Sequence, residues 1–212
     1  MAKLYFRYGA MNSGKTTSLL QTAHNYEERG QKVLLMKAGV DTKGDDTILS
    51  RLGVRRRVDL VVGAQDNVRL LVRRRLLMGQ GRPGAAPQAS ARLREVLDCV
   101  LVDEAQFLTP SQVNQLMEIV LLDDVPVLAY GIRTDFRTTS FPGSRRLLEI
   151  AHSLEELKTI CRCGCKAIFN ARKIGQDFIF DGDQVAIDDI NVTYESLCGK
   201  CYLEAGGSLA SA

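Results

Sequence analysis

Hydrophobic positions along the chain form two kinds of segment, and the two kinds alternate. Short continuous apolar runs, such as VLLMKA, predict buried strands of a parallel sheet. Longer stretches with an apolar residue at every third or fourth position predict amphipathic helices. The expected strands are residues 3–8, 33–38, 58–62, 99–106 and 125–131. The expected helices are residues 15–29, 67–78 and 110–122. Strands that alternate with helices indicate an α/β fold around a parallel sheet.

The pattern changes near residue 153, which predicts a second, smaller unit. From there long helices vanish, short β-like pieces such as DFIFDG follow, and five of the six cysteines appear. Residues 79–91 are rich in Gly, Pro and Ala and have no period, so we expect a flexible surface insertion there. The expected organisation is an α/β domain over 1–152, a small domain over 153–203 and a disordered tail over 204–212.

Residues 9–16 read GAMNSGKT and lie between the first expected strand and the first expected helix. The spacing, Gly9, four residues and then Gly14-Lys15-Thr16, is that of a phosphate-binding loop. In such a loop the backbone amides and the positive helix end face the phosphates. Lys15 can reach the outer phosphates, and the hydroxyl of Thr16 can bind Mg²⁺. A chance glycine turn before a helix is the alternative, but it does not account for this spacing in this context. We therefore predict that the chain binds a nucleoside triphosphate with Mg²⁺.

A pair of acids, Asp103 and Glu104, ends the apolar part of VLVDEAQF. Ligands of parallel α/β sheets bind at the carboxyl ends of the strands, where GAMNSGKT also lies. In phosphate-loop proteins an acid here helps to hold Mg²⁺, and the adjacent Glu can act as general base. The pair suits a kinase, in which Glu104 takes a proton from a substrate hydroxyl. It equally suits a strand-separating ATPase, in which Glu104 activates water, although such motors generally need two cores and this chain has room for one.

The clustered cysteines predict a metal site. In a cytosolic protein such clustering favours metal binding over disulfides. CGKC offers Cys198 and Cys201, and CRCGC offers two ligands out of Cys161, Cys163 and Cys165. Four thiolates close a tetrahedral zinc site without an open position, so the zinc would be structural rather than catalytic.

Composition and charge narrow the range of partners. The chain has 212 residues, 45% of them hydrophobic, and a net charge of +3. No apolar run approaches the roughly 20 residues of a membrane span, and the N-terminus has no basic-then-apolar leader. We therefore expect a cytoplasmic protein without a membrane partner. The arginine runs at 55–57 and 73–75 could touch phosphate, but a solvated face is the more common role of such runs.

The order of these motifs resembles the type II thymidine kinases. The resemblance covers residues 3–202 and is carried by GAMNSGKT, KAGVDTKGDD with SRLG, VDEAQF, GIRTDFRTTSFPGS and the cysteine groups flanking TYESLC. It implies a RecA-like P-loop domain and a small C-terminal zinc-ribbon domain, whose long loop, or lasso, closes over thymidine. It also implies transfer of the γ-phosphate of ATP to the 5′-hydroxyl of thymidine, inhibition by dTTP and a homotetramer.

The resemblance also assigns roles to individual residues. Glu104 matches the general base, and Asp41 matches an Asp near the metal. The residues that match the nucleotide site are Gly9, Ala10, Met11, Asn12, Ser13, Gly14, Lys15, Thr16, Asp41, Asp103, Glu104, Ala105 and Gln106. Those around the nucleoside are Met11, Phe107, Arg133, Phe136, Phe141 and Tyr194. The implied metal ligands are Cys161, Cys163, Cys198 and Cys201 for zinc, and Thr16 and Asp103 for magnesium.

The sequence departs from the family pattern at four places, one of which is the long insertion at 79–91. Lys43 stands where the family often has Arg, which keeps the charge but loses a bidentate fork. The first cysteine pair has one intervening residue rather than two, which leaves Cys165 as a rival zinc ligand. IDDINVTY replaces the family's Ile-Gly-Gly stretch before Tyr194 and is one residue longer.

A second interpretation of the same motifs is a nucleic-acid-dependent ATPase with one RecA-like core and a zinc ribbon that grips DNA. Such a ribbon needs exposed aromatics and a basic excess. Residues 176–195 instead hold six acids and no Lys or Arg, which disfavours contact with a phosphate backbone, so we expect no nucleic-acid partner. Because this segment is tied at both ends to cysteines and poor in large apolar groups, we expect it to open easily and to order on a bound nucleoside.

Overall fold

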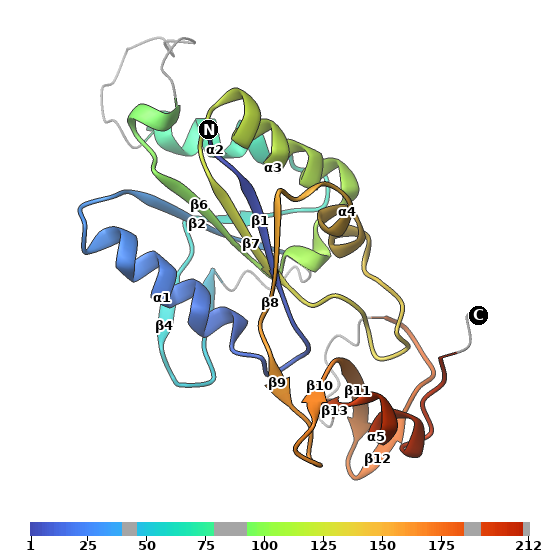
Figure 1. Ribbon diagram of the computed structural model, residues 1–212. Coiled ribbons are helices and arrows are strands. Elements are labelled where there is room, and N and C mark those ends of the chain that lie inside the picture. The colour runs from blue at the N-terminus through green and yellow to red at the C-terminus, as the bar shows by residue number, and fades with distance from the viewer. Residues whose placement is uncertain (40–45, 79–92, 185–191, 210–212) are drawn as a thin grey trace.

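The computed structural model describes residues 1–39, 46–78, 93–184 and 192–209. Asp41 and Lys43 lie outside these residues, as do the expected insertion at 79–91 and residues 185–191 of the segment 176–195 that is expected to order on a bound nucleoside. The described residues form a large α/β unit and a small β-rich unit at its lower right in Figure 1.

Six strands form the central sheet of the large unit, in the order β5-β2-β6-β7-β1-β8 (Figure 1). Every neighbouring pair is parallel, so the predicted parallel α/β fold is confirmed. The strands are β1 Leu4–Tyr8, β2 Val33–Ala38, β5 Leu60–Val62, β6 Cys99–Asp103, β7 Val127–Gly131 and β8 Ser153–Glu156. Their carboxyl ends share one edge of the sheet, so the loop after β1 and the acids at the end of β6 lie at the same edge.

Helices cover both faces of this sheet, because successive strand residues point to opposite sides. The helices of the large unit are α1 Lys15–Glu27, α2 Val68–Met78, α3 Pro110–Leu122 and α4 Pro142–Ile150. On the face covered by α1, Leu19 shares a buried cluster with Leu35. On the other face, covered by α2, α3 and α4 (Figure 1), Leu116 shares a cluster with Leu34. Leu34 and Leu35 thus serve two different cores, which explains the continuous apolar run of β2.

Local signals set several element boundaries. Helix α3 begins at the predicted residue, because Thr109 and Gln112 form a capping box in which each side chain accepts from the other's backbone N–H. The predicted strand over 99–106 is wrong in its last residues. The strand ends at Asp103, and Ala105–Phe107 form a 3-10 turn, η2, since Glu104 adopts a left-handed backbone that a strand cannot continue through.

The small unit consists of two antiparallel sheets and one helix. It contains β9 Thr159–Ile160, β10 Lys166–Ala167, β11 Phe169–Ile174, β12 Asp177–Ile179, β13 Val192–Leu197 and α5 Gly199–Glu204. Strand β9 pairs with β10, and β11 pairs with both β12 and β13. Its own core includes Ala171, Leu197 and Tyr202. The first residues of the expected second domain, Ser153–Glu156, instead pair with β1 as β8, so the central sheet extends beyond the expected boundary at 152.

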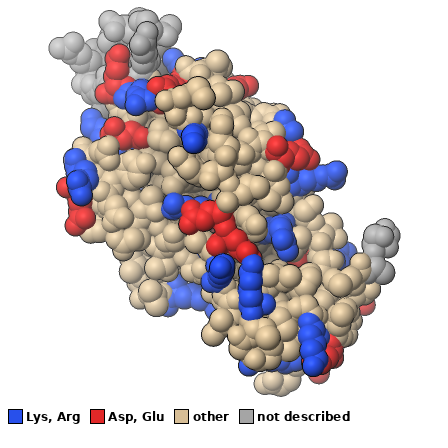
Figure 2. Space-filling view, in the orientation of Figure 1, with Lys and Arg blue, Asp and Glu red and all other residues tan. Residues whose placement is uncertain are grey.

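The remaining elements are a hairpin, β3 Thr47–Leu49 and β4 Arg55–Arg57, and a 3-10 turn, η1 Leu93–Glu95. The arginine runs lie on β4 and α2 and are paired with acids: Arg56 with Glu27, and Arg73 with Asp123. Figure 2 shows basic and acidic side chains interspersed on the face in view. Among the described residues, no helix combines the length and the apolar content that crossing a bilayer requires.

Candidate active site

The loop between β1 and α1 is shaped by its backbone conformation. A Cβ on Gly9 would lie 2.5 Å from the carbonyl oxygen of Leu157, so only glycine fits there. Asn12 and Gly14 adopt left-handed backbone, with φ of 65° and 75°, and Gly14 is the N-cap residue of α1. The first turn of α1 carries no acid, so the positive end of the helix dipole is available to a phosphate group.

Lys15 is folded back over this loop. Its Nζ donates to the carbonyl oxygen of Ala10 at 2.7 Å and to Oγ of Ser13 at 3.3 Å. Burial lowers the pKa of Lys15 to about 8, against the opposing effect of the Glu104 and Asp103 carboxylates. The amine therefore keeps its charge at neutral pH and is held ready for an anion in the loop.

Thr16 and Asp103 provide two oxygens that suit a magnesium ion. The Thr16 hydroxyl donates to Oδ2 of Asp103 at 3.4 Å, and Asp103 is only 4% exposed. Burial, and after it the neighbouring Glu104 carboxylate, raises the pKa of Asp103 to about 7. A divalent cation bound to these oxygens would offset this unfavourable pairing of buried acids, and hydroxyl and carboxylate oxygens are its preferred ligands.

Glu104 is held in an unusual conformation beside Asp103. Its φ is 51°, which is uncommon for a residue with a Cβ. Its carboxylate accepts a short hydrogen bond from Nε2 of Gln106, whose Oε1 in turn accepts from the amide of Ile132 at 3.2 Å. Gln106 is 1% exposed. A buried amide fixed at both ends thus orients the carboxylate that the sequence predicts to be the base.

A single cavity of about 930 Å³ joins the phosphate loop, Glu104 and a group of aromatic side chains. A cavity of this size suits a small-molecule ligand. The predicted site residues that line it are Met11, Asn12, Gly14, Lys15, Thr16, Glu104, Gln106, Phe107, Phe136, Phe141 and Tyr194. Others that line it were not predicted, among them Leu49, Arg51, Leu52, Asp135, Asn170 and Gln184.

Aromatic rings form the apolar end of the cavity. Phe107 and Phe141 contact edge to face, with ring centroids 5.5 Å apart. Phe136 and Phe141 are almost fully buried, whereas Tyr194 is half-buried and comes from β13 of the small unit. Flat rings on several sides suit the insertion of a planar base.

The sequence analysis does not predict Arg172, whose side chain contacts two of these aromatic residues, Phe136 and Tyr194. Its guanidinium lies 3.8 Å from the centroid of the Phe136 ring, and its Nε donates to the Tyr194 hydroxyl at 3.2 Å. Its Nη2 donates to the carbonyl oxygen of Asp183 at 2.7 Å. A lone Arg in a short strand is normally read as solvent-exposed, yet Arg172 is 5% exposed. The only sequence signal is the polar alternation of Asn170 and Arg172 within FNARKI.

Some predicted site residues lie elsewhere. Arg133 lines a separate small cavity together with Gly9 and Ala10, so it lies behind the phosphate loop. Ala105 is fully buried in η2, beneath the acid pair. Asp41 lies outside the described residues. A nucleoside contact for Arg133 and a metal contact for Asp41 therefore stay predictions.

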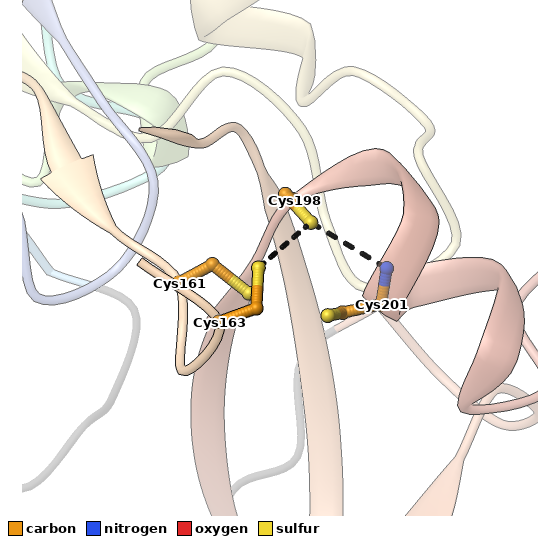
Figure 3. A group of neighbouring side chains, drawn as sticks. All are labelled: Cys161, Cys163, Cys198 and Cys201. Carbon is orange, nitrogen blue, oxygen red and sulfur yellow. Dashed lines mark hydrogen bonds between the residues drawn. The ribbon is translucent and has the colours of Figure 1, made fainter. Parts of the chain in front are cut away.

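Four of the predicted cysteines come together at one end of the small unit (Figure 3). The Sγ atoms of Cys161, Cys163, Cys198 and Cys201 all lie within 4.8 Å of one another. The first two come from the turn between β9 and β10. Cys198 is the N-cap of α5, where its sulfur accepts from the amide of Cys201. Cys165 is exposed and outside this cluster.

The chemistry of this donor set fits zinc. Four sulfurs at these separations match a tetrahedral Cys₄ site, and three of the four residues are buried. Burial raises the pKa of Cys161, but hydrogen bonds from the backbone of Cys163 and Cys198 outweigh burial and lower this pKa to about 7. A hydrogen bond with the sulfur of Cys163 raises the pKa of Cys201 to about 12. Because zinc binds thiolates, binding of the ion would release protons from these thiols.

Comparison with known proteins agrees with the class that this fold and site define, a P-loop α/β protein whose small unit carries a cluster of four cysteines. The sequence model of the family described as thymidine kinase matches residues 2–69 and 85–202. The thymidine kinase of Ruegeria pomeroyi is 46% identical over 209 residues, covering 98% of this chain and 96% of the relative. That of Idiomarina loihiensis is 47% identical over 209 residues, covering 98% and 99%. The chain belongs to the thymidine kinase family.

Comparison with solved structures adds nothing to this assignment. A crystal structure of Bacteroides Pif1 bound to ssDNA matches with a TM-score of 0.29 and 12% identity, over 70% of this chain and 32% of the other. At that TM-score the likeness carries no argument.

Proposed function

We propose that this chain transfers the γ-phosphate of ATP to the 5′-hydroxyl of thymidine. The observation that carries the proposal is the single cavity in which Lys15, Glu104 and the aromatic side chains meet. The phosphate loop suits the triphosphate, the aromatic side chains suit a base, and Glu104 lines the same cavity. Membership of the thymidine kinase family supports thymidine as the acceptor.

In the proposed reaction Glu104 takes the proton of the 5′-hydroxyl while that oxygen attacks the γ-phosphorus. The bond from the γ-phosphorus to its bridging oxygen breaks, and ADP leaves with the electron pair. Lys15 offsets negative charge on the phosphate oxygens. The products are thymidine monophosphate and ADP, and Glu104 returns its proton to water.

The two metals have different tasks in this proposal. Thr16 and Asp103 would hold Mg²⁺, which would offset negative charge on the phosphate groups. Cys161, Cys163, Cys198 and Cys201 would hold a structural zinc ion, since four thiolates leave no open position for chemistry. Cys165, exposed and outside the cluster, becomes the weaker candidate for this role.

The resemblance to type II thymidine kinases adds further proposals: feedback inhibition by dTTP, assembly into a homotetramer and action in the cytoplasm. Unpaired thiols suit a reducing compartment. The rival interpretation, an ATPase that depends on nucleic acid, has less support, because arginines in both basic runs are paired with acids on the protein itself.

The direct test is to incubate the protein with ATP, Mg²⁺ and each of the four common deoxynucleosides in turn. We expect a monophosphate product with thymidine and one ADP released for each product formed. ATP hydrolysis that rises with single-stranded DNA, with no nucleoside phosphorylated, would instead support the ATPase.

A further inference from the structure

The antiparallel strands β11 and β13 contact the phosphate loop through two residues that lie opposite each other. Asn170 and Ser196 are register partners in this strand pair, and both are buried, at 2% and 6% exposure. The amide of Met11 donates to Oδ1 of Asn170 at 2.7 Å, and the Ser196 hydroxyl donates to the carbonyl oxygen of Met11. One residue of the loop is thus held at both its backbone groups by the small unit.

The bonds of Asn170 extend to a third segment. Its Nδ2 donates to the carbonyl oxygen of Thr134 at 2.8 Å, in the chain that follows β7. Both ends of the side-chain amide are therefore used, and the bonds join the small unit, the phosphate loop and the large unit. Buried polar side chains with complete hydrogen bonding fix their neighbours in one arrangement.

A third hydrogen bond between the small unit and the phosphate loop is made to the next residue, Asn12. The Thr159 hydroxyl, from β9, donates to the carbonyl oxygen of Asn12 at 3.3 Å. In a planar trans peptide, the C=O of one residue and the N–H of the next point in opposite directions, and the described residues contain no cis peptide. Because the carbonyl groups of Met11 and Asn12 point to the small unit, the amides of Asn12 and Ser13 point away from it.

We propose that Asn170 and Ser196 form a clamp that positions the phosphate loop for nucleotide binding, a role that rests on the proposed function of this site. By holding Met11, the clamp sets the direction of the amides that follow it, which phosphate-binding loops use to hold the anion. Neither residue needs to contact the reacting atoms. Both are positioning residues, and the small unit thereby contributes to the binding of ATP as well as to that of the nucleoside.

The test is equilibrium binding of a fluorescent ATP analogue, with Mg²⁺ and without nucleoside, to full-length Ser196→Ala and Asn170→Leu. Ser196→Ala loses one hydrogen bond and should weaken binding by about two- to tenfold. Asn170→Leu loses two, to Met11 and to Thr134, and should weaken binding at least as much. Ser196→Thr, which keeps the hydroxyl, should restore most of the affinity. Thr193→Ala removes an exposed hydroxyl of the same strand and should bind like the wild type.

A second readout separates the clamp from a general loss of structure. Hydrogen exchange of the Met11 amide should be faster in Asn170→Leu, while the core strand β6 keeps its protection. If Asn170→Leu does not fold, the affinity of Ser196→Ala for the ATP analogue tests the clamp by itself. Wild-type affinity for the ATP analogue in Ser196→Ala, or equal weakening in Thr193→Ala, would overturn the clamp. Since no nucleoside is present, failure of the wild type to phosphorylate thymidine would overturn only the proposed function.

Discussion

At the scale of single residues, the reaction centre depends on how Glu104 is held. Its left-handed backbone is sterically unfavourable for a residue with a Cβ, and such conformations occur where the surrounding structure requires one side-chain direction. Here Gln106 fixes the direction of the Glu104 side chain, because it donates to the Glu104 carboxylate and itself accepts from the amide of Ile132. Gln106, predicted as a nucleotide contact, therefore also has a positioning role within the protein.

Replacing Asp103 with Asn should stabilise the metal-free protein, and more at high pH than at low pH. Burial, followed by the Glu104 carboxylate, raises the folded-state pKa of Asp103 to about 7, whereas the unfolded chain has about 3.9. The stability linked to this proton is complete below the unfolded pKa and is lost as pH rises through the folded pKa.

Denaturant unfolding of both proteins without Mg²⁺ checks this prediction. Between about pH 4 and about pH 8 the wild type should lose a few kcal/mol relative to Asp103→Asn. Asp181→Asn, at an exposed carboxylate, should show no such trend. A stability difference between wild type and Asp103→Asn that is independent of pH would show that Asp103 carries its charge without penalty.

Tyr194→Ala should raise the KM for thymidine much more than the KM for ATP. The Tyr194 ring lines the cavity, and its hydroxyl accepts from Arg172 rather than from the phosphate loop. Tyr194→Phe keeps the ring but loses the bond from Arg172, so its effect should be smaller. Steady-state kinetics with each substrate varied in turn provides the measurement, and equal changes in both KM values would remove Tyr194 from the nucleoside site.

Residue roles could be predicted from the sequence where a spacing rule exists and not elsewhere. Gly14, Lys15 and Thr16 follow from the loop spacing alone. Asn170 and Arg172 do not, because their burial results from pairing β11 with β13 and from the position of Phe136, both set by tertiary contacts. Side chains of this kind are visible only once segments distant in the chain are brought together.

At the scale of elements, locally encoded segments are predicted best. Helix α3 has the predicted bounds, since Pro110 and the Thr109 capping box mark its start, and β2 has the predicted bounds because both of its faces are buried. Strands β8, β9 and β10 are too short to show a period. Their existence depends on partners elsewhere in the chain, so sequence periodicity cannot reveal them.

The cysteine cluster supports a prediction about the metal of the small unit. Protein purified without chelator should contain one tightly bound zinc ion per chain. Cys163→Ser should lose it, because its sulfur lies 3.6 Å from that of Cys198. Cys165→Ser, two residues further along the chain, is the matched control and should retain the zinc. Elemental analysis decides, and zinc retained in Cys163→Ser but lost in Cys165→Ser would transfer the ligand role to Cys165.

At the scale of the whole molecule, the site lies between two units with separate cores. The large unit supplies the phosphate loop and the acid pair, and the small unit supplies Tyr194 and the contacts to Met11. The fold class and the presence of both units could be predicted from the sequence, because periodicity and cysteine spacing differ along the chain. The contact between the small unit and the phosphate loop could not be predicted from the sequence, because it consists of hydrogen bonds between residues more than a hundred positions apart.

The role of Glu104 as general base is tested by the turnover of Glu104→Gln with ATP and thymidine, measured together with its affinity for ATP. Loss of a general base should lower kcat by about 10²–10⁴-fold, while the affinity for ATP stays close to that of the wild type, because Lys15 and the loop are unchanged. Glu118→Gln, at an exposed site on α3, controls for the substitution itself. Thymidine phosphorylation by Glu104→Gln within about threefold of the wild-type rate would remove Glu104 from the mechanism, because removal of a general base typically costs at least about 10²-fold.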